Sequence, residues 1–187
     1  MTAVERCDVA LIMIDATEGV TEQDAKIAGI AHDRGKGIII VVNKWDAIEK
    51  NDKTMHQHTE RIRQILSFMP YAEIMFISAK TGQRTDKIFG MIQMVIENNS
   101  MRIATGVLNE IVTEAVAMQQ PPSDKGKRLK IYYTTQAAVK PPTFVVFVND
   151  KNLMHFSYLR YLENRIRDAF GFRGTSLKFI VRERKGQ

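Results

Sequence analysis

The chain has 187 residues, of which 44% are hydrophobic and 26% are charged, and its net charge is +6. This is an ordinary globular balance, and nothing in the composition indicates disorder. The longest apolar runs, such as residues 38–42, are too short to span a bilayer. The one cysteine, Cys7, excludes an internal disulfide, and the first residues show no signal-peptide pattern. We therefore expect a cytoplasmic protein without a membrane segment.

The positive charge lies entirely in the second half of the chain. Residues 1–98 contain 12 Lys+Arg and 14 Asp+Glu, a net charge of −2, whereas residues 99–187 contain 15 and 7, a net charge of +8. A basic module of this kind favours contact with a polyanion such as RNA. A generically basic, solvated surface gives the same count, so charge alone does not decide between them.

The first half alternates predicted strands and helices. Nearly continuous apolar runs predict buried strands over residues 7–16, 37–42 and 74–78. Apolar residues at helical spacing predict helices over residues 21–33, 53–69 and 84–97, the first opened by a capping box of Thr21 and Asp24. Repeated strand–helix units predict an α/β domain with a parallel sheet, whose ligands bind beyond the carboxyl ends of the strands.

The second half has a different order of predicted helices and strands, αββαβ, which predicts an α+β domain. The predicted elements are a helix over 100–119, strands over 128–136 and 143–149, a helix over 154–170 and a strand over 176–184. A linker rich in proline and glycine covers residues 120–126. We place the domain boundary near Asn98–Asn99, which gives domains over 1–98 and 99–187.

The strongest functional motif is Asn43-Lys44-Trp45-Asp46, directly after the second strand. Asp46 at this place can accept two hydrogen bonds from the N1 and N2 donors of guanine, which adenine does not offer. The Asn43 amide can tie neighbouring loops together. The aliphatic stem of Lys44 can lie over the purine face while its charge stays in water.

A second loop, Ser78-Ala79-Lys80, follows the third strand. The two loops resemble those of translation-factor-related GTPases, in which the middle residue, here Ala79, meets guanine O6 through its backbone N–H. The expected guanine-binding residues are Asn43, Lys44, Asp46, Ser78, Ala79 and Lys80.

Longer stretches narrow the resemblance. Residues 15–24 resemble a segment of the Der, Era and TrmE group, and residues 127–133, 140–144, 147–150 and 155–167 resemble the KH-like domain that ends proteins of the Der (EngA) family. The resemblance implies that residues 1–98 are the end of a second GTPase domain, a partial P-loop-type sheet. It also implies a parent protein that binds GTP or GDP with magnesium, hydrolyses GTP and acts in large ribosomal subunit assembly.

The phosphate-binding loop of such a GTPase, Gly-x4-Gly-Lys-Ser/Thr, does not occur in the 187 residues. We therefore expect the magnesium ligands and switches to be absent, guanine nucleotide to bind weakly or not at all, and the chain alone to be inactive. We interpret Asp15 as structural. The strand over residues 9–14 is expected to have an unpaired, apolar edge that favours self-association.

The expected RNA contacts are Arg160, Arg165, Arg167 and Arg173. Gly171-Phe172-Arg173-Gly174 fits the Gly-x-x-Gly loop of KH domains, but it follows a helix and precedes a strand, which also fits a helix cap and turn. The four histidines show no metal-ligand spacing.

Two alternatives to the interpretation of this chain as part of a ribosome-assembly GTPase stay open. The chain could be a stand-alone KH-like module that binds ribosomal RNA or protein without nucleotide. Its basic domain could instead relay nucleotide state between GTPase domains, without contacting RNA.

Overall fold

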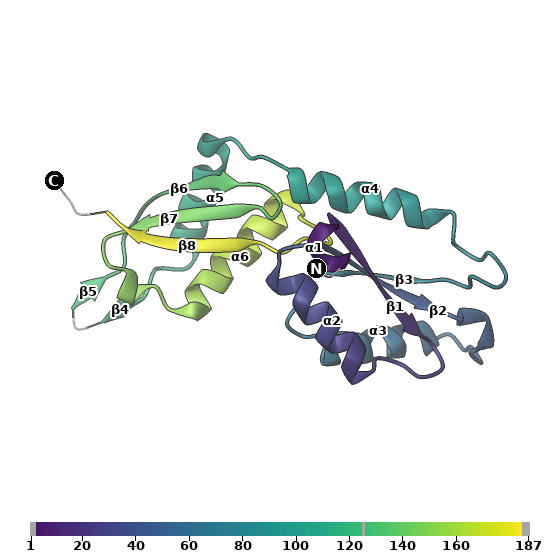
Figure 1. Ribbon diagram of the computed structural model, residues 1–187. Coiled ribbons are helices and arrows are strands. Elements are labelled where there is room, and N and C mark those ends of the chain that lie inside the picture. Colours follow the sequence, from purple (N-terminus) through teal and green to yellow (C-terminus); the bar gives the residue numbers. More distant parts are fainter. Residues whose placement is uncertain (1–2, 125, 185–187) are drawn as a thin grey trace. The chain divides into compact units, whose positions relative to one another are not determined.

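The computed structural model describes residues 3–124 and 126–184, and the chain divides into two compact units (Figure 1). Unit 1 comprises Met1–Asn99 and Phe172–Ser176, and unit 2 comprises Ser100–Gly171 and Leu177–Gln187. The short segment Phe172–Ser176 therefore belongs with the first unit, although its sequence neighbours on both sides belong to the second. Among the described residues no helix is both long and apolar enough to cross a membrane.

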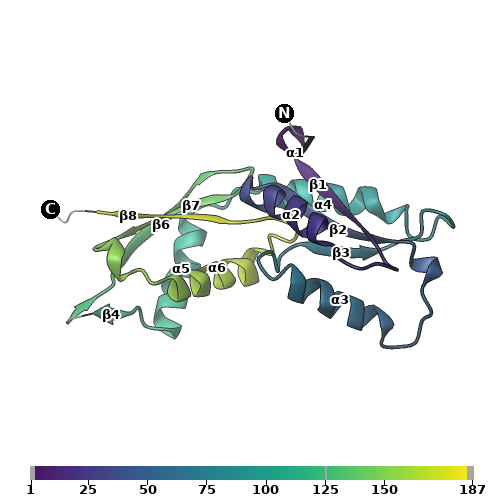
Figure 2. The same cartoon turned by 60° about the horizontal axis from the view of Figure 1, so that its bottom comes forward.

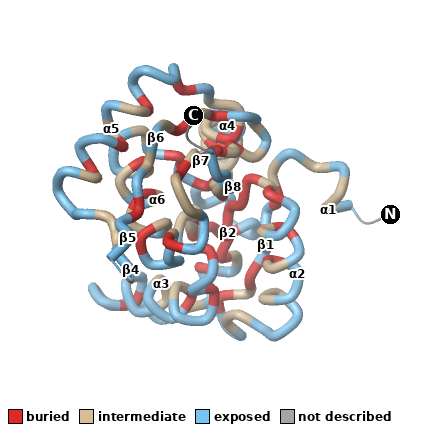
Figure 3. The backbone as a smooth tube through the Cα atoms, turned by 90° about the vertical axis from the view of Figure 1, so that its left-hand side faces the viewer, coloured by how far each residue is buried: buried red, intermediate tan, exposed pale blue. Residues whose placement is uncertain are grey.

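Unit 1 contains a three-stranded parallel sheet, as the strand–helix repeats predict. Its strands are β1 (Val9–Asp15), β2 (Gly37–Asn43) and β3 (Glu73–Phe76), in the order β1-β2-β3. The central strand β2 is a run of isoleucine and valine that is almost fully buried (Figure 3). An unbroken apolar run is typical of a parallel strand that is covered on both faces.

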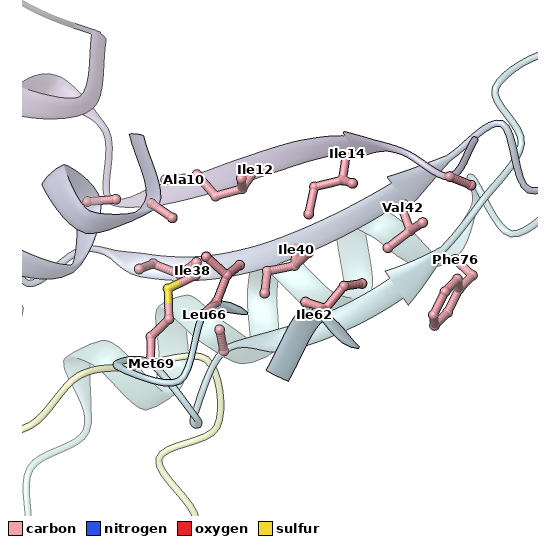
Figure 4. Packing of buried hydrophobic residues seen from close by; sticks show 14 of the residues in the cluster. Ala10, Ile12, Ile14, Ile38, Ile40, Val42, Ile62, Leu66, Met69 and Phe76 are labelled. Atoms are coloured by element: carbon pink, nitrogen blue, oxygen red, sulfur yellow. The ribbon is translucent and has the colours of Figure 1, made fainter. Parts of the chain in front are cut away.

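Helices supply the cover for both faces of this sheet. The helices of unit 1 are α1 (Ala3–Arg6), α2 (Glu22–Asp33), the 3-10 turn η1 (Trp45–Ala47), α3 (Thr54–Ile65) and α4 (Lys87–Ser100). On one face Ile38, Ile40 and Val42 pack with Ile62 and Leu66 (Figure 4). On the other face Ile39 and Val41 of β2 pack with residues of α4 such as Val95. The predicted capping box of Thr21 and Asp24 is confirmed at the start of α2.

The segment Phe172–Ser176 is hydrogen-bonded into unit 1. The Ile38 N–H donates to Gly174 O at 2.7 Å, and the Gly174 N–H donates to Tyr71 O at 2.9 Å. Arg173 pairs with Glu73 through two contacts, Nε–Oε1 at 3.0 Å and Nη2–Oε2 at 2.6 Å. Gly174 has φ +71°, and a Cβ there would collide with the side chain of Val95. Glycine is therefore required here for packing within unit 1.

Unit 2 has the predicted αββαβ order. It consists of α5 (Thr105–Met118), β6 (Ile131–Ala138), β7 (Thr143–Val148), α6 (Phe156–Phe170) and β8 (Lys178–Glu183). The sheet order is β6-β7-β8, with β6 antiparallel and β8 parallel to β7. Helices α5 and α6 lie on one face of this sheet (Figure 2).

Part of the expected linker is a small hairpin in the structure. β4 (Ser123–Asp124) pairs antiparallel with β5 (Lys127–Arg128), and Gly126 at the turn has φ +79°. Lys125, within the expected linker, lies outside the described residues. A 3-10 turn, η2 (Lys151–Leu153), precedes α6.

The helix predicted from Ser100 begins later than expected. α4 continues to Ser100, residues 101–104 form no helix, and α5 begins at Thr105. Buried Gln136 explains the break, because its side chain forms hydrogen bonds with backbone groups that would otherwise bond within a helix. The Ile103 N–H donates to Gln136 Oε1 at 2.7 Å, and Gln136 Nε2 donates to Met101 O at 2.8 Å. The apolar spacing runs on through this break and therefore does not reveal it.

Replacing Ile40 by alanine tests the core of unit 1. Ile40 is fully buried in the central strand, so Ile40→Ala should lower the free energy of unfolding of unit 1 by about 2–5 kcal/mol. Trp45, the single tryptophan, is buried in the same unit, and its fluorescence in a urea titration reports this transition. Met13→Ala is the control, because Met13 is 48% exposed, and a comparable loss there would contradict this view of the core.

Candidate guanine-nucleotide site

The two predicted base-reading loops leave neighbouring strands at the same edge of the sheet. Asn43 is the last residue of β2, and Lys44 then adopts a left-handed conformation with φ +61°. The Trp45 side chain turns inward and packs against Phe76 at a ring-centroid distance of 4.5 Å, and the Trp45 backbone N–H donates to Ile77 O at 3.0 Å. Trp45 thus anchors the first loop in the core and leaves Lys44 and Asp46 exposed.

Two side-chain hydrogen bonds join the loops. The Ala79 N–H donates to Asn43 Oδ1 at 2.9 Å, and Ser78 Oγ donates to Asp46 Oδ1 at 2.6 Å. Ser78 Oγ also accepts from the Thr81 N–H at 3.1 Å, which fixes the turn after β3. The Asn43 side chain does tie the loops together, as the sequence suggests. The part played by Ser78 was not expected.

Asp46 is held as a carboxylate. The hydrogen bond from Ser78 is the main cause that lowers the pKa of Asp46, and the charges of Lys80 and Lys50 act in the same direction. An ionised aspartate is acceptor-only, which is what a ligand with two neighbouring N–H donors requires. Asp46 therefore has both the exposure and the protonation state to accept from the N1 and N2 groups of guanine.

Lys44 pairs with Asp15, a contact that the sequence analysis missed. Lys44 Nζ lies 2.5 Å from Asp15 Oδ2, and Asp15 Oδ1 accepts from the N–H and the hydroxyl of Thr17 at 2.9 and 2.7 Å. These bonds, that of Lys44 first, lower the pKa of Asp15 to about 2, and the same pair raises the pKa of Lys44. The position of Asp15 at the end of the first strand could have indicated this contact, because Asp15 lies in register with Asn43, the residue before Lys44.

The pair gives Asp15 the structural role that the sequence suggested, and it orients the lysine stem. Whether this stem covers a purine stays a prediction. The Ala79 N–H, expected to meet guanine O6, is engaged by Asn43 in this structure, so a bound base would have to share or replace that bond. Lys80 is exposed beside these groups. In residues 3–124 and 126–184, no cluster of three or more His, Cys, Asp or Glu side chains is placed to hold a metal ion.

The four expected RNA contacts differ in their surroundings. Arg160 is exposed, whereas Arg165 lies 3.9 Å from Asp168, Arg167 pairs with Glu163 at 2.9 Å, and Arg173 is the partner of Glu73. The tyrosines of the same helix are engaged in unit 2: the Tyr158 and Tyr161 hydroxyls donate to Gln119 O and Ala115 O, each at 2.8 Å. These tyrosines hold α6 against α5, so they do not offer free faces for base stacking.

Comparison with known proteins agrees with both units. Residues 1–100 match the family model of the elongation factor Tu GTP-binding domain, and residues 102–182 match the model described as the KH-domain-like region of EngA bacterial GTPase enzymes, C-terminal. The chain is 82% identical over 185 residues to GTPase Der of Agathobacter rectalis, a match that covers 99% of this chain. The chain belongs to the Der (EngA) family.

Other members of the family extend the match. The chain is 74% identical to GTPase Der of Lachnoclostridium phytofermentans and 59% identical to that of Alkaliphilus oremlandii, over 99% and 100% of its length. In each case it spans 42% of the relative's length. Among solved structures, Era of Aquifex aeolicus bound to GDP and aluminium fluoride is 22% identical with a TM-score of 0.41, covering 97% of this chain and 67% of that one.

Replacing Ser78 by alanine tests the origin of the Asp46 charge. Ser78→Ala removes the main group that lowers the pKa of Asp46, so this pKa should rise toward its ordinary value, as followed by carboxyl NMR. Because folding lowers this pKa, the unsubstituted chain loses stability as the pH falls below about 4 and through the folded-state pKa, and the variant should lose less. Thr17→Val is the control: it also removes a hydroxyl that donates to an aspartate, but that aspartate is Asp15, so the pKa of Asp46 should not change. An unchanged Asp46 pKa in Ser78→Ala would refute the assignment.

Proposed function

We propose that the chain combines the guanine-recognising end of a GTP-binding domain with a KH-like module that contacts ribosomal RNA. The parent protein would hydrolyse GTP in the cytoplasm and act in large ribosomal subunit assembly. The observation that carries the nucleotide part is the pair of loops bridged by Asn43–Ala79 and Ser78–Asp46. The net charge of +8 in residues 99–187 supports the RNA part.

On this proposal, phosphate and magnesium would be bound by a part of the parent protein other than these 187 residues. The 187 residues contain no Gly-x4-Gly-Lys-Ser/Thr motif, and phosphate contacts are central to binding and catalysis in this class of protein. On this proposal the chain alone binds guanine nucleotide weakly and does not hydrolyse it.

The base-reading role of Asp46 predicts a change of specificity. In a protein that joins this chain to its phosphate-binding loop, Asp46→Asn should shift preference from guanine to xanthine nucleotides by at least about tenfold, because xanthine presents an acceptor where guanine has its N2 donor. Competition between GTP and XTP measures the shift. Asp15→Asn is the matched control and should leave the preference unchanged, whereas retained GTP preference in Asp46→Asn would refute the assignment.

The edge strand β1 predicts self-association of the isolated chain. β1 ends the sheet order of unit 1, and Leu11 and Met13 are 37% and 48% exposed on one of its faces. An unpaired apolar strand edge tends to pair with another chain. Light scattering should show a concentration-dependent increase in mass, and Met13→Lys should reduce it. A clean monomer at all concentrations would contradict this expectation.

The second candidate function is that of an RNA- or ribosome-binding module that does not use nucleotide. Only the positive charge of residues 99–187 favours it. It predicts RNA or ribosome binding in a parent protein that has no phosphate-binding loop. A relay role for the basic domain predicts salt-independent binding or none, because contacts to phosphates weaken steeply with salt.

A further inference from the structure

The three-stranded sheet of unit 2 has two chemically different faces. Alternate residues of its strands pack against α5 and α6, among them Val146, Val148, Phe179 and Val181. The intervening residues point to the opposite face, since successive side chains of a strand alternate. None of the described helices of unit 2 covers that second face (Figure 2).

Residues of the second face form cross-strand rows. Tyr133, Phe147 and Arg182 are in register across β6, β7 and β8, and Thr135, Val145 and Ile180 form the next row. Thr143 and Lys178 follow in register. We call these eight residues, together with Arg184, the sheet platform.

The aromatic side chains of the sheet platform stack on one another. The rings of Tyr133 and Phe147 lie 4.4 Å apart between centroids with an interplanar angle of 17°. The guanidinium of Arg184 lies over the Tyr133 ring at 5.9 Å. Both rings are half-buried, so part of each surface stays in contact with solvent. Stacked aromatic and guanidinium planes are a surface on which unpaired bases can stack.

The charge of the sheet platform is positive. Lys178, Arg182 and Arg184 are exposed, and the platform contains no carboxylate. Glu183 alternates to the other side of β8, where its Oε1 accepts from the Lys151 N–H at 3.1 Å. Within the described parts of the chain, none of the three cations has an ion pair with a carboxylate at 4 Å or less. Ile180, 42% exposed, adds an apolar patch between them.

We propose that the sheet platform binds single-stranded RNA, with unpaired bases stacked on the solvent-exposed part of the Tyr133, Phe147 and Arg184 stack and phosphates on Lys178 and Arg182. This inference rests on the proposed RNA contact of the basic domain and names the surface responsible. Duplex RNA does not fit, because its bases are already stacked inside the helix. The platform differs from α6, whose tyrosine hydroxyls are engaged with the backbone of unit 2.

Fluorescence anisotropy of the whole 187-residue chain tests the proposal. The probe is a labelled, unstructured RNA of about ten nucleotides, within the range of lengths bound by single-strand-binding surfaces. The chain should bind it at least about tenfold more tightly than a duplex of the same length. Binding should weaken as salt rises.

Variants separate the sheet platform from other basic surfaces. Tyr133→Leu keeps an apolar residue and removes the stacking ring, so it should weaken binding about tenfold or more, whereas Tyr133→Phe should retain it. Arg182→Ala should also weaken binding. Arg160→Ala removes one exposed charge from α6, where the sequence analysis expects an RNA contact, and it therefore tests the competing surface. If the platform is the binding surface, Arg160→Ala should have at most a small effect. Circular dichroism verifies that each variant is folded.

The outcomes distinguish this inference from the broader proposal. If Arg160→Ala weakens RNA binding and the platform variants do not, the basic domain contacts RNA and the platform inference is wrong. Equal affinity for single strands and duplex would also overturn it. If the chain binds neither RNA, both proposals fail and a protein partner becomes the better explanation of the exposed face.

Discussion

The hydrogen bond from the Ala79 N–H to Asn43 Oδ1 connects the two loops on which the nucleotide site depends. Each loop is short and presents polar groups at the edge of the sheet, while Trp45 in the first loop and Ser78 in the second are buried. The side chain of Asn43 acts as an acceptor for the neighbouring loop, so the end of β2 and the end of β3 become one surface. A single neutral hydrogen bond contributes only about 1 kcal/mol. Its importance here lies in the geometry that it sets.

Further contacts with the core and with the end of β1 stabilise this geometry. Trp45 anchors the first loop in the core beside Phe76, and buried Ser78 holds Asp46 in the charged state. Lys44 and Asp15 connect the end of β1 to the same edge. Together the ends of all three parallel strands are joined by polar side chains next to an apolar core. This arrangement is buried where it meets the sheet, at Trp45 and Ser78, and exposed at Lys44 and Asp46, where a base would bind.

Much of the fold was predictable because its signals are local. Apolar runs predicted the buried strands, the Thr21 capping box predicted the start of α2, and the αββαβ order followed from periodicity. The break before α5 was not predictable, since it depends on Gln136, more than 30 residues away in sequence. The hairpin of β4 and β5 was also missed, because two-residue strands leave almost no pattern.

In the site, too, features set by local sequence were predictable and features set by distant residues were not. The motif residues and the bridging role of Asn43 could be predicted from chemistry and position along the strands. The Lys44–Asp15 pair and the hydroxyl of Ser78 depend on how neighbouring strand ends align, which a linear pattern shows only indirectly. Arg173 is instructive: its sequence context suggests an RNA-binding loop, yet its guanidinium is paired with Glu73, and Gly174 is required by the packing of Val95.

The central claim is that the two bridged loops read guanine. Amide NMR of the 187-residue chain during titration with GDP to millimolar concentrations tests it most directly, because weak binding is still visible as shifted signals. The account predicts shifts of Ala79, of the Asn43 side-chain amide and of the residues around Asp46, and no such shifts with ADP. Unchanged loop signals with GDP, or equal shifts with ADP, would contradict it.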